Sequence, residues 1–507
     1  MPVIFPASCK VGNNMSYKKL KSGTDVRGIA SCLGGNTVDL TQEAVSDISY
    51  AFVVWFVNKF AKASNDLKIS IGHDSRITAD SISSSVIDAL VESGVTVLNC
   101  NLASTPAMFM TTIDLEADAA IQITASHHPF DRNGLKFFIK SGGLEGSDIA
   151  EILDLADNGE RVITDVKGSV CNVEYMSTYA ARLRKIICES LKCSESDKPL
   201  SGYKIVVDAG NGAGGFYAYD VLEKLGADIT GSRFLEPDGM FPNHVPNPEN
   251  AEAMKSICDA VKETKADLGL IFDTDVDRAG CVDSSGNEIN RNRLIALSST
   301  IAMENNPGAT IVTDSVTSDG LKKFIENELK GKHYRYRRGY KNVINKAIEL
   351  CNSGINCPLA IETSGHAALK ENYFLDDGAY LVTKIVIEVA KGKDLNAILS
   401  SLEMPAEERE CRFNILLDDF KEYGNNVIAE LEKFASQFPD RYTIADDNRE
   451  GIRVSTQNGW FLLRMSVHDP VMPMNFESNI EGGIAEDIKL LKPFFDRFEY
   501  LDCSSLN

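Results

Sequence analysis

The sequence predicts an α/β protein with three similar mixed α/β domains and a smaller C-terminal α+β domain around one central cleft. A chain of 507 residues is too long for a single hydrophobic core. Three strand–helix–strand stretches repeat along it, and the pattern changes after about Cys411. The predicted domains are residues 1–170, 171–291, 292–408 and 409–507.

Each repeat opens with an apolar strand, continues with a helix and closes with a second strand. The opening strands show no alternation of apolar and polar residues, which indicates that helices cover both faces of the sheet. The opening strands are expected within residues 67–76, 203–212 and 309–316, the helices within 79–94, 216–226 and 318–331, and the closing strands within 95–100, 227–234 and 332–340.

A further apolar strand in each repeat ends in a cluster of polar residues. These strands cover residues 119–123, 268–272 and 358–361, and they are followed by TASHHP, DTDVDR and ETSGH. Because ligands gather at the carboxyl ends of strands in open α/β sheets, the three clusters are expected to face one cleft. The fourth segment should contain a helix at 420–438, strands at 451–455 and 460–465, and then RMSVHDP.

The composition excludes some partners. The formal net charge of −21 argues against nucleic acid and anionic membranes, which need a basic surface. A few clustered cations can still bind a small anionic substrate. The most apolar helical stretch, Ile48 to Val57, is too short to cross a bilayer. The twelve cysteines form no CxxC pair, so we expect reduced thiols in a cytoplasmic protein.

The DTDVDR cluster places three aspartates at alternate positions, Asp273, Asp275 and Asp277. On a strand or an extended loop, alternate side chains point the same way. Three adjacent carboxylates repel each other unless they share a cation, and their hard oxygen atoms suit Mg²⁺. The simpler interpretation is a solvated acidic turn. Arg278 follows directly and is a candidate to bind an anionic oxygen or one of the aspartates.

The TASHHP cluster offers Ser126 as a nucleophile or as the carrier of a phosphate group. The alternative role for such a serine is the N-cap of a helix. His127 and His128 are candidate general bases, although histidines are more often structural. Lys136 follows a turn-like RNG and is long enough to reach back to a phosphoryl group.

The two remaining clusters suit a sugar phosphate. Glu362, Ser364 and His366 of ETSGH combine the donors and acceptors that a polyol requires. RMSVHDP contains an arginine with hydroxyl and imidazole groups, which can bind a phosphate. Its candidate phosphate-binding residues are Arg464, Ser466 and His468.

Two further patterns are typical of other enzyme classes. Ser126, Asp273 and His366 follow the chain order of a hydrolase triad, but the G-x-S-x-G motif is absent. The glycines of Gly210–Gly215 fit G-x-G-x-x-G between a strand and a helix, with Asp228 near the position of a ribose ligand. The second pattern leaves a nicotinamide-dependent enzyme as an alternative.

Taken together, the motifs resemble the α-D-phosphohexomutase family, the phosphomannomutase/phosphoglucomutase enzymes, over nearly the whole chain. SGTDVRG is similar to the N-terminal motif with its substrate-facing arginine, here Arg27. TASHHP resembles the phosphoserine loop, and NGLK places Lys136 at the position of the active-site lysine. RRGYKN places Lys341 at the lysine position of the third domain, and ETSGH resembles the sugar-specificity loop.

The resemblance implies a phosphohexomutase that interconverts hexose 1-phosphate and hexose 6-phosphate, of mannose or glucose, through phosphorylated Ser126. It implies Mg²⁺ bound by Ser126 and the three aspartates. It also gives Arg27 and Lys136 the role of stabilising the transferred charge, with Lys136 or His127 moving the proton. A phosphoglucosamine mutase is the alternative within the family. RMSVHDP departs from the usual phosphate loop at Val467, His468 and Asp469, so a non-catalytic sugar-phosphate binder is also considered.

Overall fold

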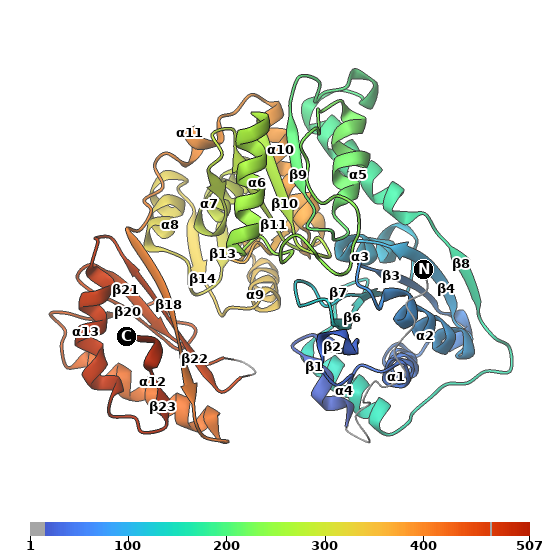
Figure 1. Ribbon diagram of the computed structural model, residues 1–507, viewed down its shortest axis with the longest axis horizontal. Coiled ribbons are helices and arrows are strands. Elements are labelled where there is room, and N and C mark those ends of the chain that lie inside the picture. Colours follow the sequence, from blue (N-terminus) through green and yellow to red (C-terminus); the bar gives the residue numbers. More distant parts are fainter. Residues whose placement is uncertain (1–15, 467–468, 507) are drawn as a thin grey trace. The chain divides into compact units, whose positions relative to one another are not determined.

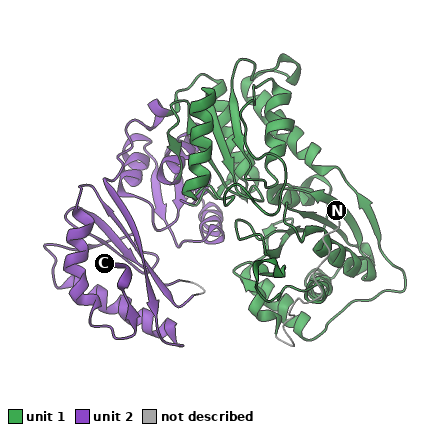
Figure 2. Cartoon of the chain, in the orientation of Figure 1, with its two compact units in different colours: residues 1–290, 364–395 green, residues 291–363, 396–507 purple. Residues whose placement is uncertain are grey.

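The computed structural model describes residues 16–466 and 469–506. The described chain divides into two compact units, which are residues 1–290 with 364–395 and residues 291–363 with 396–507 (Figure 2). Among the described helices, none combines the length and the apolar character that a bilayer crossing requires.

Unit 1 begins with an eight-stranded mixed sheet in the order β1-β2-β6-β5-β3-β4-β8, with β7 paired to β6 (Figure 1). β3, β4, β5 and β8 pair in parallel, whereas β5, β6, β2 and β1 pair antiparallel. Its strands are β1 (Lys21–Ser22), β2 (Asp25–Ile29), β3 (Lys68–His73), β4 (Thr96–Leu102), β5 (Ala119–Ile123), β6 (Arg132–Ile139), β7 (Gly142–Gly143) and β8 (Ser169–Asn172).

Four helices accompany this sheet, namely α1 (Gln42–Phe60), α2 (Ala79–Glu92), α3 (Thr105–Asp114) and α4 (Gly146–Asp157). The expected opening strand, helix and closing strand of the first repeat are confirmed as β3, α2 and β4. The middle of β3 is buried at four successive positions, as expected for a strand covered on both faces. Phe52 and Trp55 of α1 are buried, and the Phe52 ring lies 4.7 Å from that of Phe137.

A second sheet of unit 1 has the order β12-β11-β10-β9, with β9 parallel to β10 and the other pairs antiparallel. A hairpin of β16 and β17 also belongs to this unit. The strands are β9 (Ile205–Asp208), β10 (Leu268–Phe272), β11 (Ala279–Asp283), β12 (Glu288–Ile289), β16 (Ala367–Leu369) and β17 (Leu375–Asp376). The helices are α5 (Tyr175–Leu191), α6 (Ala251–Thr264) and α10 (Gly378–Ala390).

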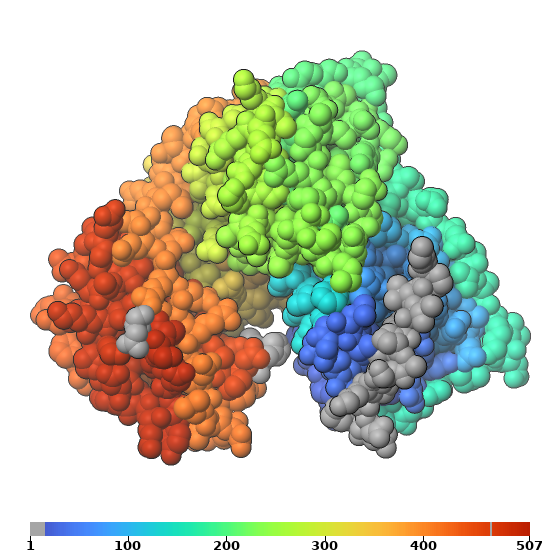
Figure 3. Space-filling model, viewed as in Figure 1, coloured from blue at the N-terminus to red at the C-terminus, as the bar shows by residue number. Residues whose placement is uncertain are grey.

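Helix α6 shows how one helix serves both core and surface. Its apolar residues, such as Ile257 and Val261, are buried in a cluster with Ile271 of β10. Its polar residues Glu252 and Lys255 are exposed, and the helix lies on the near face in the space-filling view (Figure 3). This division follows from the 3.6-residue period of an amphipathic helix.

The second repeat differs from the prediction in two places. The expected closing strand at 227–234 is wrong, because this segment makes only isolated bridges from Asp228 and Arg233. Asp228 instead accepts a hydrogen bond from Thr230 N, and Gly231 has a positive φ, so the chain turns. The expected helix forms as a π-helix, Tyr217–Leu222, followed by a 3₁₀ turn.

Unit 2 contains two groups of strands. β13 (Thr310–Thr313) pairs in parallel with β14 (Lys332–Arg335) and with β15 (Leu359–Ile361), as the third repeat predicts. The helices of this part are α7 (Arg291–Met303), α8 (Asp319–Lys323) and α9 (Tyr340–Asn352), and α11 (Leu395–Leu399) starts at the last residue of unit 1.

The C-terminal part of unit 2 is an antiparallel sheet in the order β19-β20-β21-β22-β18-β23. Its strands are β18 (Glu407–Ile415), β19 (Thr443–Ile444), β20 (Ile452–Ser455), β21 (Gly459–Leu463), β22 (Val471–Ser478) and β23 (Leu501–Asp502), and its helices are α12 (Phe420–Ser436) and α13 (Gly483–Phe495). The expected helix at 420–438 and the strands near 451–455 and 460–465 are therefore confirmed.

Candidate active site

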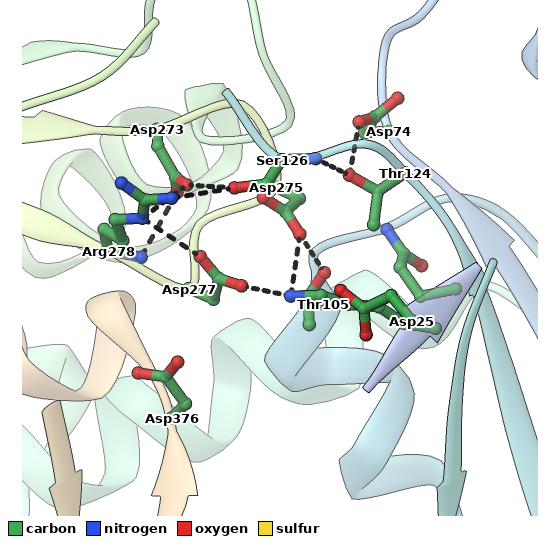
Figure 4. Close-up of polar contacts among 12 residues, drawn as sticks. Asp25, Asp74, Thr105, Thr124, Ser126, Asp273, Asp275, Asp277, Arg278 and Asp376 are labelled. Carbon is green, nitrogen blue, oxygen red and sulfur yellow. Dashed lines mark hydrogen bonds and ion pairs between the residues drawn. The ribbon is translucent and has the colours of Figure 1, made fainter. Parts of the chain in front are cut away.

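Ser126 lies in a loop that follows β5 directly. The residue is 1% exposed and has a φ of 52°, a left-handed conformation that is uncommon for a non-glycine residue. Its N–H donates to Thr124 Oγ1 at 2.8 Å, and the Thr124 hydroxyl donates to Asp74 Oδ2 at 2.7 Å. Figure 4 shows Thr124 between Asp74 and Ser126. The helix N-cap alternative is wrong, because the next helix, α4, starts at Gly146 with Glu145 as its cap.

The acidic loop follows β10 in the second sheet of unit 1. Asp273, Asp275 and Asp277 each offer a carboxylate oxygen, and these atoms all lie within 4.8 Å of one another. The loop is a turn and not an extended segment, since Val276 has a φ of 68° and its N–H donates to Asp273 O. The carboxylates therefore converge through a turn instead of through strand alternation, and the solvated-turn interpretation is wrong because all three aspartates are buried.

Backbone donors from three separate segments hold this loop. Ala213 N–H donates to Thr274 O at 2.8 Å, Thr105 N–H to Asp275 O at 2.8 Å, and Gly378 N–H to Val276 O at 3.1 Å. The Thr105 hydroxyl also donates to Asp275 Oδ2. Three successive carbonyl groups are thus fixed by parts of the chain that are distant in sequence.

The electrostatics of the acidic loop favour a bound cation. Burial, with the charges of Asp277 and Asp275, raises the pKa of Asp273 well above its ordinary value. Burial and the charge of Asp277 also raise the pKa of Asp275. Burial opposes ionisation of Asp277 too, but Lys136 and other nearby cations hold its pKa below the usual range. Three buried carboxylates with these opposed shifts are difficult to ionise together.

The oxygen atoms of the acidic loop also fit a metal ion. Asp275 Oδ1 and Asp277 Oδ1 are buried and accept no hydrogen bond from any described residue. Ser126 Oγ lies 3.3 Å from Asp273 Oδ2, which brings the serine to the same group (Figure 4). Buried carboxylate oxygens without donors are suitable ligands for a divalent cation. The loop can therefore hold a metal beside Ser126.

Two cations contact this group, Lys136 from β6 and Arg278 from the end of the acidic loop, directly before β11. Lys136 on β6 is 4% exposed, and its Nζ lies 2.5 Å from Asp277 Oδ2 and 3.7 Å from Asp275 Oδ2. Arg278 donates from NH2 to Ser126 Oγ at 3.2 Å, and its Nε lies 3.5 Å from Asp273 Oδ2. The structure thus brings both predicted cations to the serine and the aspartates.

The histidines after the serine are neutral. Burial, with the charges of Arg278 and other cations, lowers the pKa of His127 to about 2, and burial with nearby arginines lowers that of His128 to about 3. His127 Nδ1 lies 2.6 Å from Arg278 NH2 and accepts its hydrogen bond. The other ring nitrogen of this neutral imidazole therefore carries the proton, and His127 can accept a further proton only at Nδ1, after the bond from Arg278 is released.

Three further predicted residues lie in unit 1. Arg27 on β2 donates to Asp25 Oδ2 at 2.8 Å, and it is paired in register with Gly134 of β6. His366 Nδ1 lies 3.8 Å from Asp277 Oδ1 and closer to Asp376 Oδ2. Ser364 is buried two residues before His366.

The other predicted residues lie in unit 2. Glu362 Oε1 accepts a hydrogen bond from Gly339 N–H at 2.6 Å, and Lys341 is in the first turn of α9. Arg464 is 9% exposed, and burial lowers its pKa while the charge of Glu450 raises it. Ser466 Oγ accepts a bond from Asp469 N–H at 3.3 Å. His468 lies outside the described residues.

Sequence comparisons identify the family. Profiles of phosphoglucomutase/phosphomannomutase α/β/α domains I, II and III match residues 19–162, 177–286 and 290–404. The chain belongs to the phosphoglucomutase/phosphomannomutase family. Membership makes it a phosphohexomutase, an isomerase, as the motifs predicted.

Relatives of this family align along most of the chain. A phosphomannomutase/phosphoglucomutase of Pseudomonas syringae pv. tomato is 32% identical over 442 residues, covering 86% of this chain and 90% of that protein. A phosphoglucomutase of Neisseria gonorrhoeae is 30% identical over 463 residues, covering 91% and 93%. The crystal structure of a phosphoglucomutase/phosphomannomutase family protein from Burkholderia thailandensis matches with a TM-score of 0.77 at 25% identity, covering 95% of this chain and 97% of that chain.

The glycine loop that suggested a nicotinamide enzyme has a structural role in this phosphohexomutase. A Cβ on Gly212 would lie 2.5 Å from Thr274 O, and one on Gly215 would lie 2.2 Å from Leu235 O. These glycines allow close packing against the chain itself, including the acidic loop, where a dinucleotide would need free space. Asp228 accepts a hydrogen bond from Thr230 N–H within a turn. The nicotinamide alternative therefore loses its physical basis.

We expect Gly212→Ala to weaken the metal site. The new Cβ must push Thr274 away, which disturbs the bond from Ala213 N–H and shifts the aspartates. The variant should lose about 1–3 kcal/mol of stability, the usual effect of overpacking, and its half-saturating metal concentration should rise. Gly143→Ala is the control, because its Cβ would meet nothing closer than 3.6 Å. Equal metal titrations for both variants would contradict this expectation.

Sequence reasoning missed several polar residues of this site. Thr105 contacts Asp275, and Asp376 contacts His366. Asp74 and Arg76 support the Ser126 loop. Asp74 follows β3 and Asp376 ends β17, so the strand-end argument used for Asp273 was the signal that pointed to them.

Proposed function

We propose that this phosphohexomutase interconverts the 1-phosphate and the 6-phosphate of mannose or glucose through phosphorylated Ser126 and a bisphosphorylated sugar. The observation that carries the proposal is the buried position of Ser126 Oγ, 3.3 Å from Asp273 Oδ2 and 3.2 Å from Arg278. A serine that only served the fold would not need both an anion-binding group and a metal-binding carboxylate beside its hydroxyl. The names of the aligned relatives support the hexose class.

The proposed reaction consists of two phosphoryl transfers. In the first, the bond between phosphorus and Ser126 Oγ breaks while a bond forms from phosphorus to the free sugar hydroxyl, whose proton is passed to Ser126 Oγ. In the second, the other phosphate of the bisphosphorylated sugar returns to Ser126 Oγ, and the proton of Ser126 Oγ is passed to the former sugar oxygen. Arg278, Arg27 and Lys136 stabilise the negative charge, and Lys136 or His127 moves the proton.

The metal in this proposal is Mg²⁺, held by Ser126, Asp273, Asp275 and Asp277. When bound, it supplies positive charge that stabilises the transferring phosphoryl group. The carboxylates keep the cation in place, and Lys136 compensates the charge of Asp277 when the cation is absent. Oxygen-only ligands favour Mg²⁺ over softer metals.

The remaining predicted residues are proposed to bind the sugar phosphate, through its hydroxyl groups and through its non-reacting phosphate. Glu362, Ser364 and His366 bind hydroxyl groups, whereas Lys341, Arg464, Ser466 and His468 bind the phosphate that does not react. We keep the four predicted domains, residues 1–170, 171–291, 292–408 and 409–507, as part of the proposal, and we place the enzyme in the cytoplasm.

Two measurements test the proposed function. Intact-mass analysis and peptide mapping of the purified protein should find a phosphate on Ser126. ³¹P NMR should then follow mannose 1-phosphate, glucose 1-phosphate and glucosamine 1-phosphate with Mg²⁺. Conversion of mannose or glucose phosphate supports the proposal, and exclusive conversion of glucosamine phosphate would assign the alternative mutase. Binding without any conversion would show a non-catalytic binder.

Arg464→Ala should raise the substrate KM by about 10- to 100-fold, which is the effect of losing one charge-assisted contact. A guanidinium binds two phosphate oxygens at once, and Arg464 is largely buried in unit 2. Steady-state kinetics should show a much smaller change in kcat. Arg441→Ala is the control, because it removes an exposed arginine of the same unit. An unchanged KM in Arg464→Ala would remove this residue from phosphate binding.

A further inference from the structure

Arg76 lies in the segment HDSR, at the end of the opening strand of the first repeat, and the proposed reaction gives it no role. It is 2% exposed, so its guanidinium is enclosed by protein. A buried cation is costly unless all its donors find partners. The partners of Arg76 therefore show what this residue does.

The guanidinium donates to four carbonyl groups of the Ser126 loop. NH1 donates to Pro129 O at 2.7 Å and to Arg132 O at 2.9 Å. NH2 donates to His128 O at 2.7 Å and to the carbonyl of Ser126 itself. One side chain thus fixes the backbone at Ser126 and along the segment that follows it.

Asp74 connects Arg76 to the other side of the serine. Its Oδ2 accepts Arg76 Nε at 3.2 Å and the Thr124 hydroxyl at 2.7 Å. Thr124 Oγ1 in turn accepts Ser126 N–H at 2.8 Å. Both peptide groups of Ser126 are therefore held by one network of Asp74, Arg76 and Thr124.

This network acts on a strained residue. The left-handed conformation of Ser126 is unfavourable for a residue with a side chain, so surrounding contacts must stabilise it. In that conformation the hydroxyl lies beside Asp273 and Arg278. Relaxation to an ordinary backbone conformation would turn the hydroxyl away from them.

A second segment of unit 1 covers the same arginine. Gly239 forms a bridge with Arg76, and a Cβ at Gly239 would lie 2.4 Å from Ile77 N. The Phe241 ring lies 5.3 Å from the guanidinium carbon. This cover excludes water, which strengthens the hydrogen bonds beneath it.

We propose that Arg76 is a positioning residue for phosphoryl transfer, which holds the Ser126 loop through its carbonyl groups and directs the serine hydroxyl toward the acidic loop. Arg76 does not touch the phosphate. The inference rests on the proposed phosphoserine function. Since a displacement of about 1 Å can reduce a rate by about 100-fold, the loss of this network should appear mainly in kcat.

Arg76→Lys tests the proposal, because lysine keeps the charge but cannot reproduce the planar set of donors. We expect kcat per folded enzyme to fall by about 10- to 100-fold with little change in KM, and transfer from a hexose bisphosphate to Ser126 to slow equally. Hydrogen exchange should accelerate in the peptide that contains residues 124–132. Arg453→Lys is the matched control, since Arg453 is 3% exposed and pairs with Asp319 in unit 2. It should lower Tm without changing kcat per folded enzyme.

Thr124→Val provides a second variant that changes no charge. This variant should also reduce kcat, and it tests the positioning role by itself if Arg76→Lys does not fold. A kcat within twofold of wild type in the folded variant would overturn the positioning role. If wild type itself takes up no phosphate at Ser126, the proposed function fails. Normal phosphate uptake by wild type and Arg76→Lys alike would overturn only the role of Arg76.

Discussion

Ser126→Ala should reduce mutase turnover by at least about 10³-fold, because it removes the atom that carries the phosphoryl group in the proposed reaction. Contacts of the hydroxyl with Asp273, Arg278 and His127 measure 3.2–3.3 Å, so their loss costs the fold little. Alanine has the same Cβ as serine and adds no new backbone strain. The Ser126 N–H bond to Thr124 also remains.

Steady-state turnover with a hexose 1-phosphate, intact mass and Tm would be measured on the purified variant. We expect no phosphate uptake and a Tm close to that of wild type. Ser70→Ala is the matched control, because Ser70 is a fully buried serine on β3 whose Oγ has no hydrogen-bond partner among the described residues. Near-normal turnover in Ser126→Ala would exclude the covalent phosphate from the mechanism.

The fold was predictable where hydrophobic burial determines it. β3, β9 and β13 are each buried at four successive positions, as expected for strands that are covered on both faces. The prediction of a closing strand in the second repeat was wrong for a local reason. The segment contains apolar residues, which suggested a strand. Asp228 and Gly231 nevertheless favour a turn, and a search for apolar runs does not detect that preference.

The active site was predictable where its residues follow one another along the chain. Ser126 and the three aspartates occur in short motifs after buried strands, and the structure brings them together. Thr105 was missed because its role depends on Asp275, which lies 170 residues away in sequence. Arg76 was missed because its role depends on hydrogen bonds to four backbone carbonyl groups. Every residue has a carbonyl group, so the sequence does not show which of them Arg76 contacts.

The divalent cation is the other element whose loss should have a large effect. Asp275→Asn removes one of three carboxylate charges and the buried Oδ1 that accepts no hydrogen bond from the described residues. Loss of a second-sphere partner commonly reduces metal affinity by about 10- to 100-fold, so loss of a ligand should cost about 100-fold or more. Mg²⁺-dependent turnover should fall at least in proportion.

The stability of the metal-free protein should change in the opposite direction. Burial and the charge of Asp277 disfavour the ionised form of Asp275, and the charge of Asp275 in turn helps to raise the pKa of Asp273. A neutral amide relieves this repulsion, and its oxygen can still accept the Thr105 hydroxyl. The Tm without metal should therefore stay the same or rise, although the Tm increase on adding Mg²⁺ should disappear.

Calorimetric titration with Mg²⁺ and thermal melts in chelator would measure both effects in Asp275→Asn. Asp283→Asn is the control, since Asp283 is a buried aspartate of the same sheet that bonds Ser285 N–H and Asn287 N–H outside the acidic loop. It should bind the metal as wild type does. A purely structural role for Asp275 predicts a lower Tm in chelator with unchanged metal affinity, and wild-type turnover that persists in chelator would remove the metal from the reaction.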